Sequence, residues 1–292
     1  MNNPPRANQP RPRQNRPRPH PPAKSPRAPH PKANGEMLRE QILADFATLR
    51  IPILADEFDQ AVRRAEQEGQ SHLQFLRLLI GQQAQQRRER AIQRRIHEAR
   101  FKEVRLLADF DWQFNAKAID RVQIEALATG EFVRRKENLI LVGQSGVGKS
   151  FILEALGRQL CAIGYRVRYT TSAELLRDLT AALADQTLPR RTRYWSSFDL
   201  LAVDEFGFDK IERSECPQAA NLLYKVIDAR HGRASTALAT NVDFEHWGDY
   251  LGDPPLAMAF LDRIVDGALL MKINGRSYRA HRAQRVGQKV AS

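Results

Sequence analysis

A short glycine-rich segment carries the residue types and the spacing that bind nucleotide phosphates. Residues 143–150 have the sequence GQSGVGKS, which fits the pattern G-x-x-x-x-G-K-[ST] at every position. An apolar run over Leu139–Val142 leads into the segment, and a helical pattern over Lys149–Ile163 follows it, as a phosphate-binding loop requires. Glycines let successive N–H groups point at phosphate oxygens, and the start of the helix adds its positive dipole end. The segment therefore predicts a nucleotide site.

Two side chains of this segment predict the cofactors, ATP and Mg²⁺. The Lys149 ammonium is expected to reach the β- and γ-phosphates, and the Ser150 hydroxyl to bind the metal. The residues that we expect to hold the nucleotide are Gly143, Gln144, Ser145, Gly146, Val147, Gly148, Lys149, Ser150 and Phe151.

An acidic pair follows a second apolar run. Phe198–Val203 predicts a buried strand, and Asp204 and Glu205 come directly after it. A carboxylate at such a strand end can meet Mg²⁺ beside the phosphate loop, so we expect Asp204 to be a metal ligand. Glu205 would then polarise the water that attacks the γ-phosphate. Without the loop upstream, the same pair would be an ordinary turn or helix cap.

A further polar residue ends the next predicted strand. Thr236–Ala239 is apolar enough for a strand and is followed by Thr240 and Asn241. The Asn241 side chain could hold a water near the γ-phosphate, while the alternative is an asparagine that only forms a turn.

These sites require a sheet of parallel strands covered by helices. From Glu137 onward, short apolar runs alternate with helical stretches as far as Leu269–Ile273. Such a succession predicts an α/β fold whose parallel sheet is flanked by helices on both faces. We expect the P-loop NTPase domain to span residues 136–285, followed by a flexible C-terminus over 286–292.

The remaining composition points to a polyanionic partner. The formal net charge of the 292 residues is +12, with a pI of about 10.1. Residues 1–35 contain eleven prolines and eight Lys or Arg but no Asp or Glu. We predict that residues 1–36 form a disordered Pro/Arg-rich tail. The tail is either a basic arm for nucleic acid or a solubilising extension.

Helical periodicity extends over residues 37–135, which predicts a small helical N-terminal domain. This region contains a one-sided arginine run that favours a nucleic-acid face over a merely solvated helix. A second basic segment lies between Ala184 and Ser197 and also contains Trp195; it suits either phosphate contacts and base stacking or an ordinary solvated loop. The candidate DNA-binding residues are Arg87, Arg88, Arg94, Arg95, Arg190, Arg191 and Arg193.

Several classes of protein are disfavoured. The two cysteines, Cys161 and Cys216, are far apart and predict neither a disulfide framework nor a zinc site. No run of 18 apolar residues suggests a membrane span, and no signal peptide is evident at the N-terminus. We expect a bacterial cytoplasmic protein.

Together these residues resemble the AAA+ ATPases, and specifically the branch of the IstB transposition helpers and the DnaC helicase loaders. The resemblance covers about residues 37–285. The phosphate loop is shared with many unrelated ATPases, whereas other sequence blocks are more specific. These blocks are ENLILVG at 137–143, LAVDEFG at 201–207, EHW at 245–247, LGDP at 251–254, LDRI at 261–264 and NGRSYR at 274–279.

The resemblance implies roles for two more arginines. Arg263 matches the arginine finger of this branch, which acts on ATP held by a neighbouring subunit. Arg279 matches the second sensor arginine, which contacts the γ-phosphate of its own subunit's ATP, and Asn241 matches the first sensor. The segment between Ala184 and Ser197 corresponds to a DNA-facing insertion of this branch.

We therefore expect an ATPase that assembles on double-stranded DNA as a ring or helical filament and presents the DNA to a transposase. The nearest alternative is a loader of a replicative helicase, which would use the same chemistry with a different partner. A P-loop kinase acting on a small molecule is less favoured, because the basic faces and the arginine-finger block are foreign to it.

Overall fold

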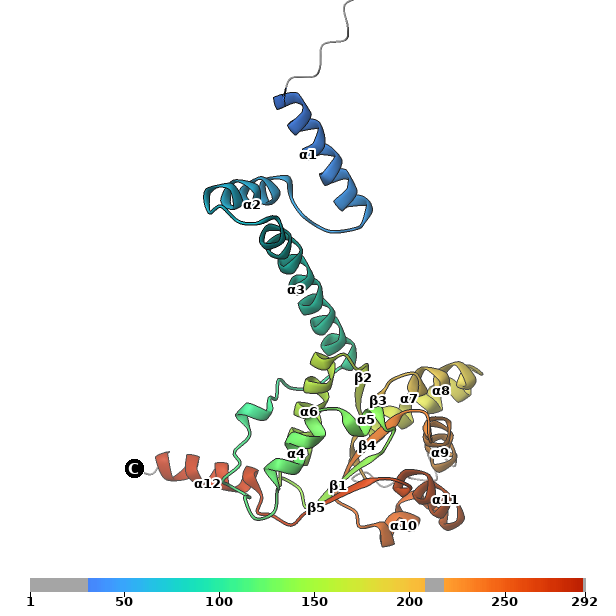
Figure 1. The fold of residues 1–292 in the computed structure, drawn as a ribbon. Helices are drawn as coiled ribbons and strands as arrows, with labels where there is room; N and C mark the ends of the chain where they lie inside the picture. Colours follow the sequence, from blue (N-terminus) through green and yellow to red (C-terminus); the bar gives the residue numbers. More distant parts are fainter. Residues whose placement is uncertain (1–30, 208–217, 291–292) are drawn as a thin grey trace, which may run out of the picture. The chain divides into compact units, whose positions relative to one another are not determined.

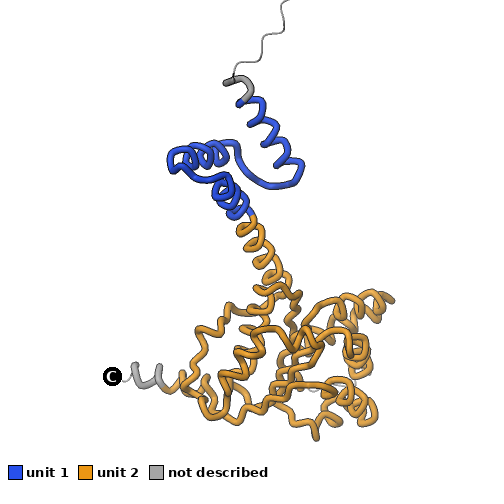
Figure 2. The backbone as a smooth tube through the Cα atoms, in the orientation of Figure 1, with its two compact units in different colours: residues 1–83 blue, residues 84–292 orange. Residues whose placement is uncertain are grey.

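The computed structural model describes residues 31–207 and 218–290 of the chain. These divide between two compact units, residues 1–83 and 84–292 (Figure 2). The predicted basic tail falls mainly on residues 1–30, and the end of the predicted flexible C-terminus falls on residues 291–292, all outside the described residues. Helix α1 (Pro31–Thr48) begins inside the segment 1–36 that the sequence predicts as disordered.

The first unit is helical, as the periodicity predicts. It contains α1, α2 (Ala55–Gln67) and the first part of α3 (His72–Ala99). Arg39 and Asp59 join α1 to α2 through a bidentate ion pair with N···O distances of 2.6 and 2.8 Å. The rings of Phe46 and Phe58 meet edge to face at 6.2 Å beside it.

The second unit is built on five parallel strands. These are β1 (Leu139–Gly143), β2 (Val167–Thr171), β3 (Leu200–Phe206), β4 (Ser235–Thr240) and β5 (Leu269–Ile273), arranged in the order β2-β3-β4-β1-β5 (Figure 1). The pairs β1–β4, β1–β5, β2–β3 and β3–β4 are all parallel. The predicted α/β fold with a parallel sheet is confirmed.

Helices cover both faces of this sheet, because strand side chains point alternately to opposite faces. Leu139 and Leu141 of β1 join one hydrophobic core, and Ile140 and Val142 join the other. On the first face lie α4 (Arg121–Ala128), α5 (Glu131–Arg134) and α6 (Lys149–Ile163). On the second face lie α7 (Ser172–Ala184), α8 (Leu188–Ser196), α9 (Ala219–Arg230), α10 (Trp247–Leu251) and α11 (Pro254–Val265).

The division between the units does not coincide with the predicted domain boundary near residue 135. Ala99, Ile119, Ile124 and Phe132 are buried in the same core as β1. The segment ahead of β1 packs with the ATPase core because its apolar side chains cover the first face of the sheet.

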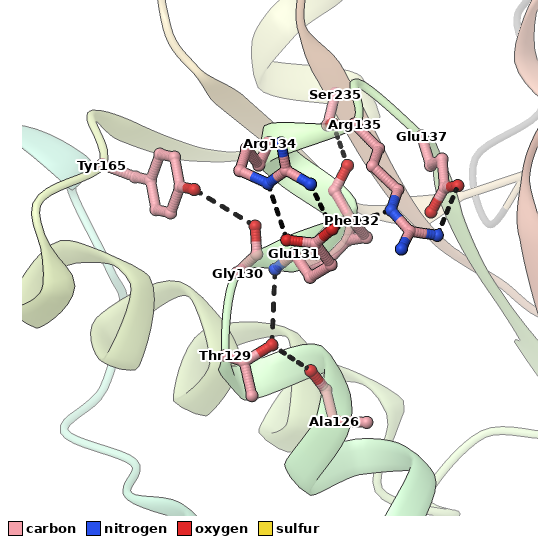
Figure 3. A network of polar contacts seen from close by, with 10 residues as sticks. All are labelled: Ala126, Thr129, Gly130, Glu131, Phe132, Arg134, Arg135, Glu137, Tyr165 and Ser235. Atoms are coloured by element: carbon pink, nitrogen blue, oxygen red, sulfur yellow. Dashed lines mark hydrogen bonds and ion pairs between the residues drawn. The ribbon is translucent and has the colours of Figure 1, made fainter.

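The turn between α4 and α5 is fixed by a polar network (Figure 3). The Tyr165 hydroxyl donates to the carbonyl of Gly130 at 3.2 Å, and the Ser235 hydroxyl donates to the carbonyl of Phe132 at 3.4 Å. Glu131 accepts from the guanidinium groups of Arg134 and Arg135. The network therefore ties the chain that enters β1 both to Tyr165, just after α6, and to β4.

Among the residues that the structure describes, no helix is long and apolar enough to cross a membrane.

Candidate functional site

The glycine-rich loop lies where the sequence predicts it, between β1 and α6. Gly148 has φ +109°, a conformation that side-chain-bearing residues rarely adopt, and it immediately precedes the helix. A Cβ at this position would also lie 3.1 Å from the ring of Phe110. The backbone N–H groups of this turn and the start of α6 make an anion site.

Lys149 is buried at the start of α6, with a relative exposure of 9%. Its ammonium donates to the carbonyl oxygens of Gly143 at 2.7 Å and Gln144 at 2.8 Å. Burial lowers the pKa of Lys149, the nearby charge of Asp204 opposes this, and the charge of Arg279 adds to it. A nucleotide phosphate would give this desolvated cation an anionic partner that the carbonyls do not supply.

Asp204 is buried within β3, two residues before the strand ends at Phe206, so the strand extends past the predicted end at Val203 and includes the acidic pair. Its Oδ2 accepts from the hydroxyl of Tyr169 at 2.7 Å, and its Oδ1 accepts from the backbone N–H of Glu205 at 2.8 Å. Burial, together with the charge of Asp204, raises the pKa of Tyr169, so its hydroxyl stays protonated as a donor. These two donors fix the orientation of the carboxylate.

Glu205 occupies an unusual backbone conformation. Its φ is +56°, and the pairing of β3 with β4 shifts register between Val203 and Phe206. Its carbonyl accepts from the Ser172 hydroxyl at 3.0 Å. Positive φ is uncommon for a residue with a side chain and clusters at functional sites. The bulge turns the exposed side chain of Glu205 toward the same cavity that Asp204 lines.

One cavity of about 640 Å³ joins these groups. It is lined by the loop from Ser145 to Phe151, by Asp204 and Glu205, and by Asn241 and Arg279. The carboxyl ends of parallel strands share one edge of the sheet, which explains why residues distant in sequence meet here. Gly143 and Gln144 do not line the cavity, but their carbonyls accept hydrogen bonds from the Lys149 ammonium.

Several lining residues were not predicted. They come from the segment between α3 and α4 and from α12 (Tyr278–Val290), and they are Glu103, Val104, Arg105, Asp109, Phe110, Asp111, Phe114, Asn115, Tyr278 and Arg282. Phe110 packs against Phe151 with ring centroids 5.2 Å apart, and the Arg105 guanidinium lies 5.7 Å from the Phe151 ring. No periodicity marks these residues. The cluster of aromatic residues ahead of the loop was the one feature of the sequence that could have indicated their place in the site.

The residues at the loop suit a hard cation. The Ser150 hydroxyl and the Asp204 carboxylate both border the cavity and are oxygen ligands of the kind that Mg²⁺ prefers. Among the described residues, no group of three or more His, Cys, Asp or Glu side chains is placed to hold a metal. A magnesium ion here would therefore complete its coordination with nucleotide oxygens and water.

Arg263 does not line this cavity. It lies on α11, where its guanidinium pairs with Asp228 at 3.0 Å and with Asp262 at 2.8 Å. The structure thus brings four of the five predicted catalytic side chains, Lys149, Glu205, Asn241 and Arg279, to one cavity and leaves Arg263 on a different surface of the same unit.

The predicted DNA-binding arginines fall into two groups. Arg87, Arg88 and Arg94 on α3, and Arg190 and Arg193 on α8, are exposed. Two others are engaged within the chain. Arg95 donates to the carbonyl of Cys161 at 2.8 Å. Arg191 forms a bidentate ion pair with Asp178 of α7.

The sequence of the chain matches one family model over residues 44–286, that of the IstB-like ATP binding proteins. The chain belongs to this family. Its site accords with the family's description, because the phosphate loop and the acidic strand end lie together in the matched region.

Relatives of this IstB-like protein are named after insertion sequences. A Pseudomonas aeruginosa protein, named as an ATP-binding protein of insertion sequence IS21, is 31% identical over 82% of this chain and 88% of its own. A Geobacillus stearothermophilus protein, named as an ATP-binding protein of insertion sequence IS5376, is 29% identical over 83% of this chain and 94% of its own.

Solved structures resemble this IstB-like protein more distantly. The DnaI structure has a TM-score of 0.48 and 21% identity, and covers 58% of this chain and 90% of its own. The DnaC helicase loader has a TM-score of 0.46 and 17% identity, and covers 61% of this chain and 98% of its own.

Proposed function

We propose that this chain is an ATPase that binds DNA, assembles on it with ATP, and delivers target DNA to a transposase or regulates that transposase. One observation carries the proposal. The phosphate loop, Asp204, Glu205, Asn241 and Arg279 line one cavity in a chain whose relatives are named as ATP-binding proteins of insertion sequences.

Hydrolysis in this proposal uses side chains that border the cavity. Lys149 holds the β- and γ-phosphates, and the Glu205 carboxylate accepts a hydrogen bond from the attacking water and polarises it. Asn241 holds that water in line, and Arg279 contacts the γ-phosphate. Magnesium, held by Ser150 and Asp204, would neutralise charge on the phosphates. Tyr169 and the Glu205 N–H fix the orientation of the Asp204 carboxylate, which would be a ligand of the metal.

Arg263 supports the assembly part of the proposal. An arginine that stabilises charge on the transferring phosphoryl group must reach the nucleotide, and Arg263 lies outside its own chain's cavity. We infer that it acts on the nucleotide of a neighbouring copy, which makes hydrolysis depend on assembly. Head-to-tail contacts of this kind generate rings or open helical filaments.

DNA binding is proposed to be electrostatic. The exposed arginines of α3 and α8 would contact phosphates, which carry affinity but little sequence information. Binding should therefore weaken steeply as salt is raised.

The proposal is tested by measuring DNA binding and particle size together, with ATP, with ADP and without nucleotide. Lys149→Ala and Glu205→Gln are measured beside the natural chain. We expect large DNA-bound assemblies with ATP, none with Lys149→Ala, and persistent ones with Glu205→Gln, because the last binds ATP without hydrolysing it.

A natural chain that binds ATP but stays monomeric on DNA would contradict the assembly, and DNA binding that ignores nucleotide would contradict its ATP dependence. Capture of a replicative helicase rather than a transposase by the ATP-bound chain would redirect the proposal to a helicase loader.

A further inference from the structure

A side-chain amide ahead of the sheet pairs with the backbone of the loop after it. The Asn115 Nδ2 donates to the carbonyl of Arg276 at 3.0 Å, and the Asn115 Oδ1 accepts from the Arg276 N–H at 3.0 Å. One asparagine amide thus satisfies both polar groups of a single residue, as a neighbouring strand would. The two residues are 161 positions apart in the chain.

The neighbouring ring strengthens this contact. Phe114 meets Tyr278 edge to face at 5.0 Å and lies 4.9 Å from the His281 ring, and the Arg276 guanidinium lies 5.1 Å from the centre of the Phe114 ring. Tyr278 and His281 belong to the first turn of α12. Phe114 and Asn115 therefore hold both the loop and the start of the helix, and Figure 1 shows α12 leaving the body beside the segment that joins α3 to α4.

The loop is shaped to admit the amide. A Cβ on Gly275 would lie 2.7 Å from Cγ and Nδ2 of Asn115, closer than a side chain could remain without moving. Glycine at 275 is therefore explained by the close approach of Asn115. This accounts for the Gly-Arg part of the NGRSYR block, which the sequence alone left without a physical reason.

The same loop touches the phosphate site. The Tyr278 N–H donates to the carbonyl of Gly146 at 2.9 Å, which joins the start of α12 to the glycine-rich loop. Arg279 is the next residue and lines the cavity. Its charge is close enough to contribute to the lowered pKa of Lys149. A displacement of residues 276–278 would therefore move Arg279 relative to the glycine-rich loop and Lys149.

We propose that Phe114 and Asn115 form a clip that positions Arg279 against the γ-phosphate, with Asn115 as a positioning residue for ATP recognition. The clip rests on the proposed function, because it assumes that Arg279 contacts the γ-phosphate. It predicts that the segment preceding the ATPase core, although it lacks any recognised nucleotide motif, sets the preference of the site for ATP over ADP.

The test measures equilibrium binding of fluorescent ATP and ADP analogues to the full chain. The variants are Asn115→Ala, Arg279→Ala and the double variant, with Gln113→Ala as the matched control. Gln113 is an exposed residue of the same segment and does not line the cavity. A thermal melt of each variant checks that it is folded.

We expect Asn115→Ala to weaken ATP binding about tenfold while changing ADP binding much less, because only ATP offers the phosphate that Arg279 contacts. The double variant should bind ATP no more weakly than Arg279→Ala alone, since both changes remove one interaction. Gln113→Ala should match the natural chain. If Asn115→Ala does not fold, Gly275→Ala replaces it, since the added Cβ displaces the amide without deleting it.

The clip is overturned if the losses of ATP affinity caused by Asn115→Ala and Arg279→Ala add in the double variant. It is also overturned if Asn115→Ala weakens ATP and ADP binding equally, or changes neither. Failure of the proposed function looks different. In that case the natural chain itself would not bind ATP, or Lys149→Ala would bind it equally well.

Discussion

At the scale of single residues, the site depends on buried charge that the protein orients before any ligand arrives. Asp204 is only 3% exposed, and its two carboxylate oxygens accept from different donors, the Tyr169 hydroxyl and the Glu205 N–H. A buried carboxylate that loses a donor retains the cost of desolvation without its compensation. Tyr169 thus contributes to stability and to the geometry of the proposed metal ligand.

Replacing Tyr169 by phenylalanine should lower the free energy of unfolding by about 2 kcal/mol, since a hydrogen bond to a charged group is lost inside the protein. Tyr165→Phe is the matched control, because the Tyr165 hydroxyl donates to a neutral backbone carbonyl. Its cost should be about 1 kcal/mol. Urea unfolding without nucleotide measures both, and equal losses would show that the charge of Asp204 adds nothing.

At the scale of the elements, α8 combines a structural face with an exposed basic face. Arg191 pairs with Asp178, and Trp195 donates its indole N–H to the same carboxylate at 2.7 Å. The buried Arg230 donates to the carbonyls of Trp195 and Phe198, which fixes the end of the helix. Arg190 and Arg193 take no part in this anchoring and are exposed.

The two faces of α8 should therefore respond differently to alanine. Arg190→Ala with Arg193→Ala should weaken DNA binding and leave stability unchanged. The slope of log affinity against log salt should fall by about 1 for each phosphate that the variant no longer neutralises. Arg191→Ala should mainly lower the melting temperature. Salt titration of DNA binding and thermal melts separate the effects, and an unchanged salt slope in the Arg190/Arg193 variant would exclude α8 from the DNA interface.

The ion pairs of α5 should give the chain an acid-sensitive contribution to stability. The guanidinium groups of Arg134 and Arg135 lower the pKa of Glu131 from 4.5 to about 2. Since the folded pKa lies below the unfolded one, the contribution is full above about pH 4.5 and is lost as pH falls toward 2.

The measurement is the difference in free energy of unfolding between the natural chain and Glu131→Gln as pH is lowered. The difference should shrink over that range, and also on adding salt, because the pair is exposed. A difference that does not vary with pH would contradict the assignment.

At the scale of the whole molecule, the chain carries its proposed arginine finger outside its own nucleotide cavity. In the single chain, Asp228 and Asp262 hold Arg263 on α11. If the neighbouring copy's nucleotide is the target of this arginine, a catalytic site is complete only between two copies.

Mixing two inactive variants should then restore hydrolysis. Lys149→Ala lacks a nucleotide site but keeps its finger, and Arg263→Ala has the reverse defect. Only the Arg263→Ala copies carry an intact loop, so in an equal mixture about half of the ATP-bearing interfaces should join that loop to the intact finger of a Lys149→Ala copy. Phosphate release by the mixture, compared with each variant alone, is the measurement. No gain above the separate variants would mean that Arg263 does not act between copies.

Local sequence was enough to predict the main elements and the chemistry of the phosphate loop. The strand and helix positions follow from apolar runs and from the period of the side chains, so the strand at Leu139–Val142 and the helix at Lys149–Ile163 could be predicted. The strand predicted to end at Val203 was also found, although it runs on to Phe206. The motif GQSGVGKS acts through its own backbone and needs little else to specify phosphate binding.

Which distant residues complete the site could be seen only in the folded chain. Phe110, Phe114 and Asn115 reach the cavity from a segment without periodicity, and Asn115 meets Arg276 across 161 positions. The fold also distinguishes among arginines that look alike in the two basic segments. Arg191 and Arg95 are engaged within the chain, whereas their neighbouring arginines are exposed. The charge and spacing of residues in the sequence indicate which chemistry they could perform. Which partner each residue contacts is decided by packing, because contacts between distant segments depend on the path of the whole chain.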